Sequence, residues 1–291
     1  MVKILKTAVS KVAAFLFAAV LFVGTMFMFV GCETKRPEIS MKIEFNGETY
    51  TLGYTLYRNM YPQTVAHYME LIDKKFYDNT VIHDYQSNYI IGGGFYYDES
   101  VGTDPLDDLL SKSEQYDALE LKNISVWSDA DKTEAYNTLY GEFYKNGGFE
   151  VENNPLSNEI GSIGTYYYTP VNTSQKVWAK MSGSKKVEER SYCYNSTTSM
   201  FYLSNTTTSD DAYCTFGVLK DGKSKTAFND LLAAIDEYVE TLQVEGEDEV
   251  AFTEDKDWTF EDKYWDAGAY TETFKVPVEP IVIKSVRVTK Y

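Results

Sequence analysis

Residues 61–94 have the sequence YPQTVAHYMELIDKKFYDNTVIHDYQSNYIIGGG, and this stretch decides the fold. Its first part places apolar side chains at helical spacing, at Val65, Tyr68, Met69, Leu71 and Ile72. The spacing predicts an amphipathic helix over residues 64–74, with Thr64 placed to cap its first turn. Residues 81–91 are rich in strand-forming side chains and lead into three consecutive glycines. We therefore expect a helix followed by strands here.

The segments on either side of this stretch add mainly strand signals. Residues 41–56 alternate apolar and polar side chains around an Asn46-Gly47 pair, which predicts a β-hairpin. Further strand-like blocks occur at residues 195–203, 215–222 and 280–288. Residues 228–242 have the apolar spacing of a second helix. The chain contains no internal repeat, so one β-rich domain is the simplest arrangement.

Taken in order, these blocks resemble the cyclophilin-type peptidyl-prolyl isomerases. Within residues 61–94, the positions in register with that family are Pro62, Thr64, Val65, Leu71, Phe76, Tyr77, Asp78, Thr80, His83, Gly93 and Gly94. Later matches are Gly141-Glu142-Phe143, Asn154-Pro155-Leu156, Gly161-Ser162-Ile163-Gly164 and the three strand-like blocks. The resemblance covers residues 43–288 and implies a mainly β fold, a closed antiparallel eight-stranded barrel capped by two helices.

Three insertions interrupt the resemblance, at about residues 98–140, 165–194 and 244–275. In the first, the segments 106–110 and 132–139 are expected to be helical. In the third, residues 245–262 are charged and are expected to form a loop. The second carries a basic cluster in an otherwise acidic protein, namely Lys185, Lys186 and Arg190.

The resemblance also implies the chemistry. A prolyl amide has a rotation barrier of about 18–20 kcal/mol, so its isomerisation requires binding of the twisted amide and no nucleophile or cofactor. In this family an apolar pocket takes the proline ring, a glutamine and other polar groups hold the backbone, and an arginine contacts the prolyl amide. The implied partners are proline-containing segments of other polypeptides.

Carried over by position, the family's three polar donors are replaced here. The arginine position holds Asp84, and the two glutamine positions hold Gly92 and Met200. The pocket is better kept: the family's phenylalanine positions hold Tyr89 and Tyr202, its methionine position holds Ile90, and a histidine position holds Tyr213. His83 lies beside this pocket, and we interpret it as a partly buried histidine rather than a base. The pattern predicts weak or absent isomerase activity.

Two alternatives follow from the same residues. A cation from the second insertion, with Arg190 first, would supply the missing donor and restore catalysis. A non-catalytic module would instead use the aromatic pocket and the insertions to bind a peptide or a protein, since insertions on a compact barrel are common places for new interfaces.

The N-terminal 31 residues have the layout of an export signal. Lys3, Lys6 and Lys11 are followed by an apolar run over residues 12–30. The run ends at Gly31-Cys32, which resembles a bacterial lipobox with Cys32 as the lipidated residue. We expect a signal peptide over residues 1–31, a tether over 32–40 and the barrel domain over 41–291. An uncleaved membrane anchor is the alternative, and both place the domain outside the cytoplasm.

Charge and cysteine content exclude other classes of function. The formal net charge is −17, and removal of residues 1–31 takes away three lysines and no acid, which gives −20. Such acidity excludes nucleic acid as a partner. Cys193 and Cys214 are expected to form either a disulfide or two buried thiols. With only two histidines in the chain, His67 and His83, we expect no transition-metal site.

Overall fold

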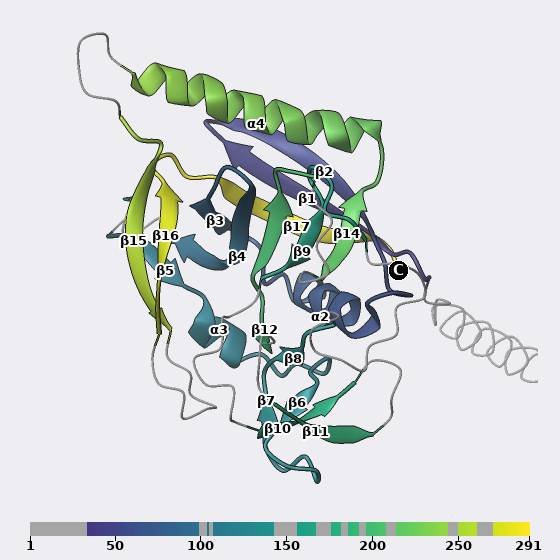
Figure 1. Ribbon diagram of the computed structural model, residues 1–291. Helices are drawn as coiled ribbons and strands as arrows, with labels where there is room; N and C mark the ends of the chain where they lie inside the picture. Colours follow the sequence, from purple (N-terminus) through teal and green to yellow (C-terminus); the bar gives the residue numbers. More distant parts are fainter. Residues whose placement is uncertain are drawn as a thin grey trace, which may run out of the picture. The chain divides into compact units, whose positions relative to one another are not determined.

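Eight antiparallel strands close into a barrel, which confirms the predicted fold class (Figure 1). Around the barrel the strands follow the order β13-β9-β14-β2-β1-β17-β3-β4, and pairing of β13 with β4 completes the circle. Their bounds are Glu38–Phe45 for β1, Glu48–Leu56 for β2, Thr80–Tyr85 for β3, Tyr89–Tyr97 for β4, Ile163–Thr165 for β9, Phe201–Ser204 for β13, Thr215–Leu219 for β14 and Val282–Lys290 for β17. Closure leaves no exposed edge along the barrel wall.

The structure is a computed structural model, and it describes residues 34–98, 104, 107–142, 156–166, 176–181, 186–191, 196–207, 214–243, 250–260 and 270–291. The predicted signal peptide, Cys32, Cys193 and Tyr213 lie outside the described residues. Cys214 is buried, and its sulfur lies 3.7 Å from Oγ1 of Thr64. No helix in the described ranges combines the length and the apolar character needed to cross a membrane.

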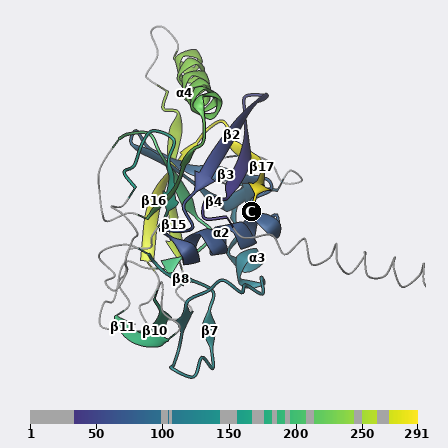
Figure 2. The ribbon, with the colours of Figure 1, turned by 90° about the vertical axis from the view of Figure 1, so that its right-hand side faces the viewer.

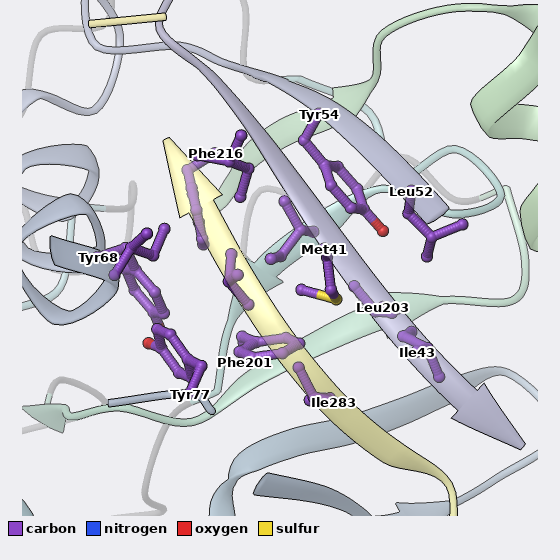
Figure 3. Close-up of a cluster of buried hydrophobic side chains, with 14 of the residues drawn as sticks. Met41, Ile43, Leu52, Tyr54, Tyr68, Tyr77, Phe201, Leu203, Phe216 and Ile283 are labelled. Atoms are coloured by element: carbon purple, nitrogen blue, oxygen red, sulfur yellow. The ribbon is translucent and has the colours of Figure 1, made fainter. Parts of the chain in front are cut away.

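The hairpin predicted for residues 41–56 is confirmed as β1 and β2, and it begins three residues earlier, at Glu38. Asn46 and Gly47 form its turn with φ values of 46° and 79°. A two-residue turn of this handedness matches the twist of the strands and favours an Asn-Gly pair. Every second side chain of β1 then points into the barrel, where Figure 3 shows Met41 and Ile43 among the interior side chains.

Two helices pack against the barrel, as expected. Helix α2 spans Pro62–Asp73, and helix α4 spans Gly222–Leu242 and packs on β2 (Figures 1 and 2). Helix α2 begins at Pro62, so the prediction of Thr64 as its cap was wrong. Proline is favoured at the first helical position because no helical partner is available there for an N–H group. The cap comes from Glu142, whose buried carboxylate accepts hydrogen bonds from the backbone N–H groups of Gln63 and Thr64.

The first insertion forms short strands where helices were predicted. Residues 109–111 form strand β5, which pairs with the end of β4, because the buried Leu109 is held against that strand. Residues 132–139 are not helical either, since Lys132 has a left-handed φ of 61° and the chain then turns into a strand. The elements of this insertion are β5 Leu109–Ser111, α3 Ser113–Asp117, β6 Val126–Trp127, β7 Ala135–Tyr136 and β8 Leu139–Tyr140.

The second insertion pairs with the first. Its strands are β10 Lys176–Lys180, β11 Val187–Ser191 and, just after it, β12 Ser196–Thr197. Strands β11, β10, β6 and β7 form a four-stranded sheet in that order, and β12 pairs with β8. A small apolar cluster packs beneath this accessory sheet, formed by Val126, Tyr140, Val177, Ala179 and Met181.

The third insertion forms a β-hairpin, so the predicted charged loop over residues 245–262 was wrong. Strand β15 spans Thr253–Phe260 and pairs with β16, Tyr270–Pro277. Asp255 and Asp257 alternate with Trp258 and Phe260, so these two aspartates lie on one face of the hairpin and the two aromatic rings on the other. Figure 1 shows the hairpin beside β3 and β4, and β16 contacts β3.

Candidate functional site

The outer face of the barrel at β3, β4 and β13 carries a second apolar cluster, separate from the interior one. We call it the outer-face cluster, and its buried members are Val81, Ile91, Phe95, Leu109, Met200, Tyr202, Phe274 and Val276. Two of these residues, Met200 and Tyr202, are predicted pocket positions. Phe274 and Val276 come from β16 of the hairpin. The cluster is therefore the place where the predicted pocket and the hairpin meet.

Strand alternation places the β13 side chains. Met200, which directly precedes β13, and Tyr202 face the outer-face cluster, while Phe201 and Leu203 face the barrel interior. The Tyr202 ring lies over Gly164, where an added Cβ would come within 2.3 Å of the ring. Its hydroxyl donates to Oδ1 of Asn158 at 2.9 Å. The ring is thus fixed against the neighbouring strand.

Strand β4 places the other predicted pocket residues on two different faces. Tyr89 packs against the outer-face cluster, but Ile90 is fully buried in the barrel interior. A Cβ at Gly92 would point to the same interior, 2.8 Å from Cδ1 of Ile82. Ile91 and Phe95 of β4 also face the outer-face cluster, and the family pattern did not indicate them.

His83 lies at an irregularity in β3 where the register with β4 shifts. Its ring is fully buried, 4.4 Å from the ring of Phe95 and 4.9 Å from that of Phe274, centre to centre. Neither ring nitrogen has a hydrogen-bond partner. Burial lowers the pKa of His83 to about 3. The nearby Val81 carbonyl has a smaller, opposite effect, but it does not meet the geometry of a hydrogen bond to the ring. The imidazole is therefore neutral and serves as packing.

Asp84, at the family's arginine position, is 3% exposed. Its Oδ1 accepts hydrogen bonds from the backbone N–H of Lys275 at 3.0 Å and from Nε2 of Gln86 at 2.9 Å. Burial raises the pKa of Asp84, and these two donors act in the opposite direction. The position that donates a hydrogen bond in the family thus accepts one from the hairpin here.

The hairpin presents its apolar face to the barrel. The rings of Trp258 and Phe95 are 4.8 Å apart, and Val276 is fully buried. Glu272 lies on the same face and accepts a hydrogen bond from the Tyr166 hydroxyl. Burial raises the pKa of Glu272, and the nearby Asp84 carboxyl adds to this shift. Alternation of apolar residues over 253–260 and 270–277 is the sequence signal that identifies this face.

The basic cluster of the second insertion lies elsewhere in the fold. Arg190 is on β11 of the accessory sheet, where its guanidinium forms an ion pair with Glu188 at 2.6 Å. That sheet pairs with none of the strands of the outer face in the described part of the chain. Lys185 lies outside the described residues. The contacts seen for Arg190 are therefore those of the accessory sheet.

Replacement of His83 by phenylalanine is expected to remove a pH dependence of stability. A histidine with a depressed folded-state pKa binds fewer protons than the unfolded chain, so the native protein loses stability below about pH 6.5. Between pH 7 and pH 5 it should lose about 2 kcal/mol relative to the variant. Asp84 and Glu272 shift stability in the other direction, but the variant retains both. Urea unfolding at both pH values measures the difference, and parallel pH profiles would contradict it.

One family model and several solved structures are similar to this chain. The family model described as "Cyclophilin type peptidyl-prolyl cis-trans isomerase/CLD" matches residues 40–240. Among solved structures, the chain is similar to a cyclophilin type peptidyl-prolyl cis-trans isomerase of Cryptosporidium parvum, with 13% identity, a TM-score of 0.40 and coverage of 88% of this chain and 99% of that one. It is also similar to the Mimivirus cyclophilin, with 12% identity, a TM-score of 0.42 and coverage of 89% and 91%. A search of curated proteins found no match.

Proposed function

Because the chain belongs to the cyclophilin-type peptidyl-prolyl cis-trans isomerase family, we propose that it is a member that binds exported polypeptides outside the cytoplasm and isomerises prolyl bonds weakly or not at all. The observation that carries this proposal is the burial of Asp84 and its hydrogen bond to the hairpin. Its carboxylate is buried and accepts the N–H of Lys275, so the position offers an acceptor where the family has a cationic donor.

Loss of donors predicts a large loss of rate. Removal of one well-placed donor to a transition state typically lowers the rate about 10²–10³-fold. Neither Asp84 as a carboxylate nor the thioether of Met200 can donate a hydrogen bond, and Gly92 has no side chain. We therefore expect these three replacements together to lower the rate of isomerisation by the usual route strongly.

Access to the outer face supports the same proposal. Met200 is 3% exposed and Tyr202 is 7% exposed, because the hairpin lies against the cluster they belong to. A prolyl substrate would have to displace Phe274 and Val276 before it reached those side chains. The retained aromatic residues favour a second candidate function, a non-catalytic module that binds peptides or proteins.

The location in the cell is part of the proposal and rests on the N-terminal sequence. Lysines followed by an apolar run and by Gly31-Cys32 support a lipoprotein signal peptide and lipidation at Cys32. The barrel, whose first strand begins at Glu38, would then be tethered to the outer face of a membrane through residues 32–37. Its acidic charge favours basic, proline-containing segments as clients.

A prolyl isomerisation assay on the full chain tests the proposal. We expect kcat/KM to be at least about 100-fold below that of an ordinary cyclophilin on the same peptide. A comparable rate would refute the proposed inactivity. In that case an Arg190→Ala variant tests whether the second insertion supplies the donor. Titration with proline-containing peptides in parallel measures binding, and its absence would refute the binding module.

A further inference from the structure

Strand β16 lies on the outer face of the barrel in the manner of a bound extended peptide. Its alternate side chains Phe274 and Val276 are buried in the outer-face cluster, while Lys275 between them is exposed. Alternate side chains also provide the specificity when an extended peptide binds a protein, although no strand pairing with the barrel accompanies them here. The face therefore binds an aromatic residue and, two residues later, a branched aliphatic one.

The backbone of β16 is recognised as well as its side chains. In an antiparallel pair, alternate residues direct their N–H groups away from the partner strand. The N–H of Lys275 is one of these, and Asp84 accepts its hydrogen bond at 3.0 Å. A buried carboxylate is a strong acceptor for such a donor. The change from a cationic donor to Asp84 at the family's arginine position thus gives the hairpin its polar anchor.

The hairpin is attached in a way that allows release. Among the described residues, β15 and β16 pair only with each other, so no backbone ladder joins the hairpin to the barrel. A two-stranded hairpin has little stability of its own in water, so its order here depends on side-chain packing and on Asp84. The hairpin also lies outside residues 40–240, the part of the chain that matches the family model.

We propose that the outer face at β3, β4 and β13 is a binding site for an extended polypeptide strand, that β16 is its resident ligand, and that Asp84 is the anchor of that ligand's backbone. The ligands it takes have an aromatic residue at one position, a branched aliphatic residue two positions later, and a free N–H between them. This inference rests on the proposed function for its client, an exported polypeptide, but its geometry is independent of any isomerase activity.

Hydrogen exchange on the full chain tests whether Asp84 holds the backbone of β16 against the barrel. An Asp84→Ala variant should exchange the amide of Lys275 about tenfold or more faster than the native protein, because its acceptor is gone. The amide of Ile43, which lies in the β1 strand, serves as an internal control and should be unchanged. A Thr271→Ala variant, altered on the exposed face of the hairpin, is the matched control. Equal exchange rates of the Lys275 amide in the native and Asp84→Ala proteins would overturn the proposal that Asp84 anchors β16.

Peptide binding tests the site itself. The probe is a labelled peptide with the β16 sequence YTETFKVP, measured by fluorescence anisotropy against the native chain and a Phe274→Ser variant. The variant weakens the resident ligand and leaves the barrel face intact, so it should bind the probe at least about tenfold more tightly. A probe N-methylated at the lysine nitrogen should lose about tenfold in affinity. Equal binding of both probes, or none by a folded variant, would overturn the proposal.

The outcomes separate this inference from the proposed function. Fast prolyl isomerisation with the expected exchange and peptide results would refute the inactivity and leave the strand-binding site standing. Slow isomerisation together with unaltered exchange of the Lys275 amide in Asp84→Ala would support the proposed inactivity and refute the role of Asp84 as anchor.

Discussion

Replacement of Gly92 by glutamine is expected to destabilise the barrel by about 2–6 kcal/mol, as overpacking and a buried unpaired amide each cost about 1–3 kcal/mol. The Cβ alone would lie 2.8 Å from Cδ1 of Ile82 and 3.1 Å from Cδ1 of Ile283. Both isoleucines belong to the interior cluster, where neighbouring side chains leave little room to move. Urea unfolding monitored by circular dichroism measures the loss.

The matched control is the same substitution at Gly222, the first residue of α4. No atom lies within 4 Å of a Cβ built there, and its φ is not left-handed. Gly222→Gln should therefore leave stability unchanged or raise it slightly, as glycine is a poor helix former. If Gly92→Gln were as stable as Gly222→Gln, the assignment of Gly92 to the interior would be wrong. A glutamine at position 92, as in the family, would thus require neighbouring side chains of the barrel interior to move.

Replacement of Glu142 by alanine is expected to cost about 2–5 kcal/mol, because two N–H groups at the start of α2 lose their acceptor. Oε2 of Glu142 accepts from Thr64 at 2.8 Å, and Oε1 accepts from Gln63 at 3.1 Å. Glu142 is 2% exposed, so water does not readily replace its carboxylate. Thermal and urea unfolding measure the change.

Two variants make this prediction specific. Glu142→Gln retains one acceptor oxygen and should lose less stability than Glu142→Ala. Glu70→Ala removes a carboxylate that also accepts backbone N–H groups, from Lys122 and Asn123, but at a more exposed position. Its loss should be smaller, because solvent can take over those hydrogen bonds. Equal losses for Glu70→Ala and Glu142→Ala would argue against burial as the cause.

The barrel was predictable from the sequence because its signals are local. Alternating side chains around the Asn46-Gly47 turn specify the first hairpin, and apolar spacing specifies α2 and α4. The start of α2 was not predictable, since its cap is Glu142, 78 residues from Thr64 in the chain. The short strands of the first insertion also depend on distant partners, as β5 does on β4 and β6 on β10.

The site was harder to predict than the fold because it depends on register. Between β3 and β4 the pairing shifts around Ile82 and Asp84, and Gly93 has a φ of 86°. These irregularities decide that Ile91 faces outward while Ile90 faces the interior, which aligned positions alone do not reveal. The hairpin was missed for another reason. Charged residues are frequent in it, although the alternation of Asp255 and Asp257 with Trp258 and Phe260 is a strand pattern.

The accessory sheet makes the first two insertions dependent on one another. Strand β10 of the second insertion pairs with β6 of the first, and β12 pairs with β8. Deletion of either insertion would leave the strands of the other with exposed, unpaired edges, which promote aggregation. The two segments, far apart in the chain, therefore depend on each other structurally, and we expect a variant that stays soluble to retain both or to lack both.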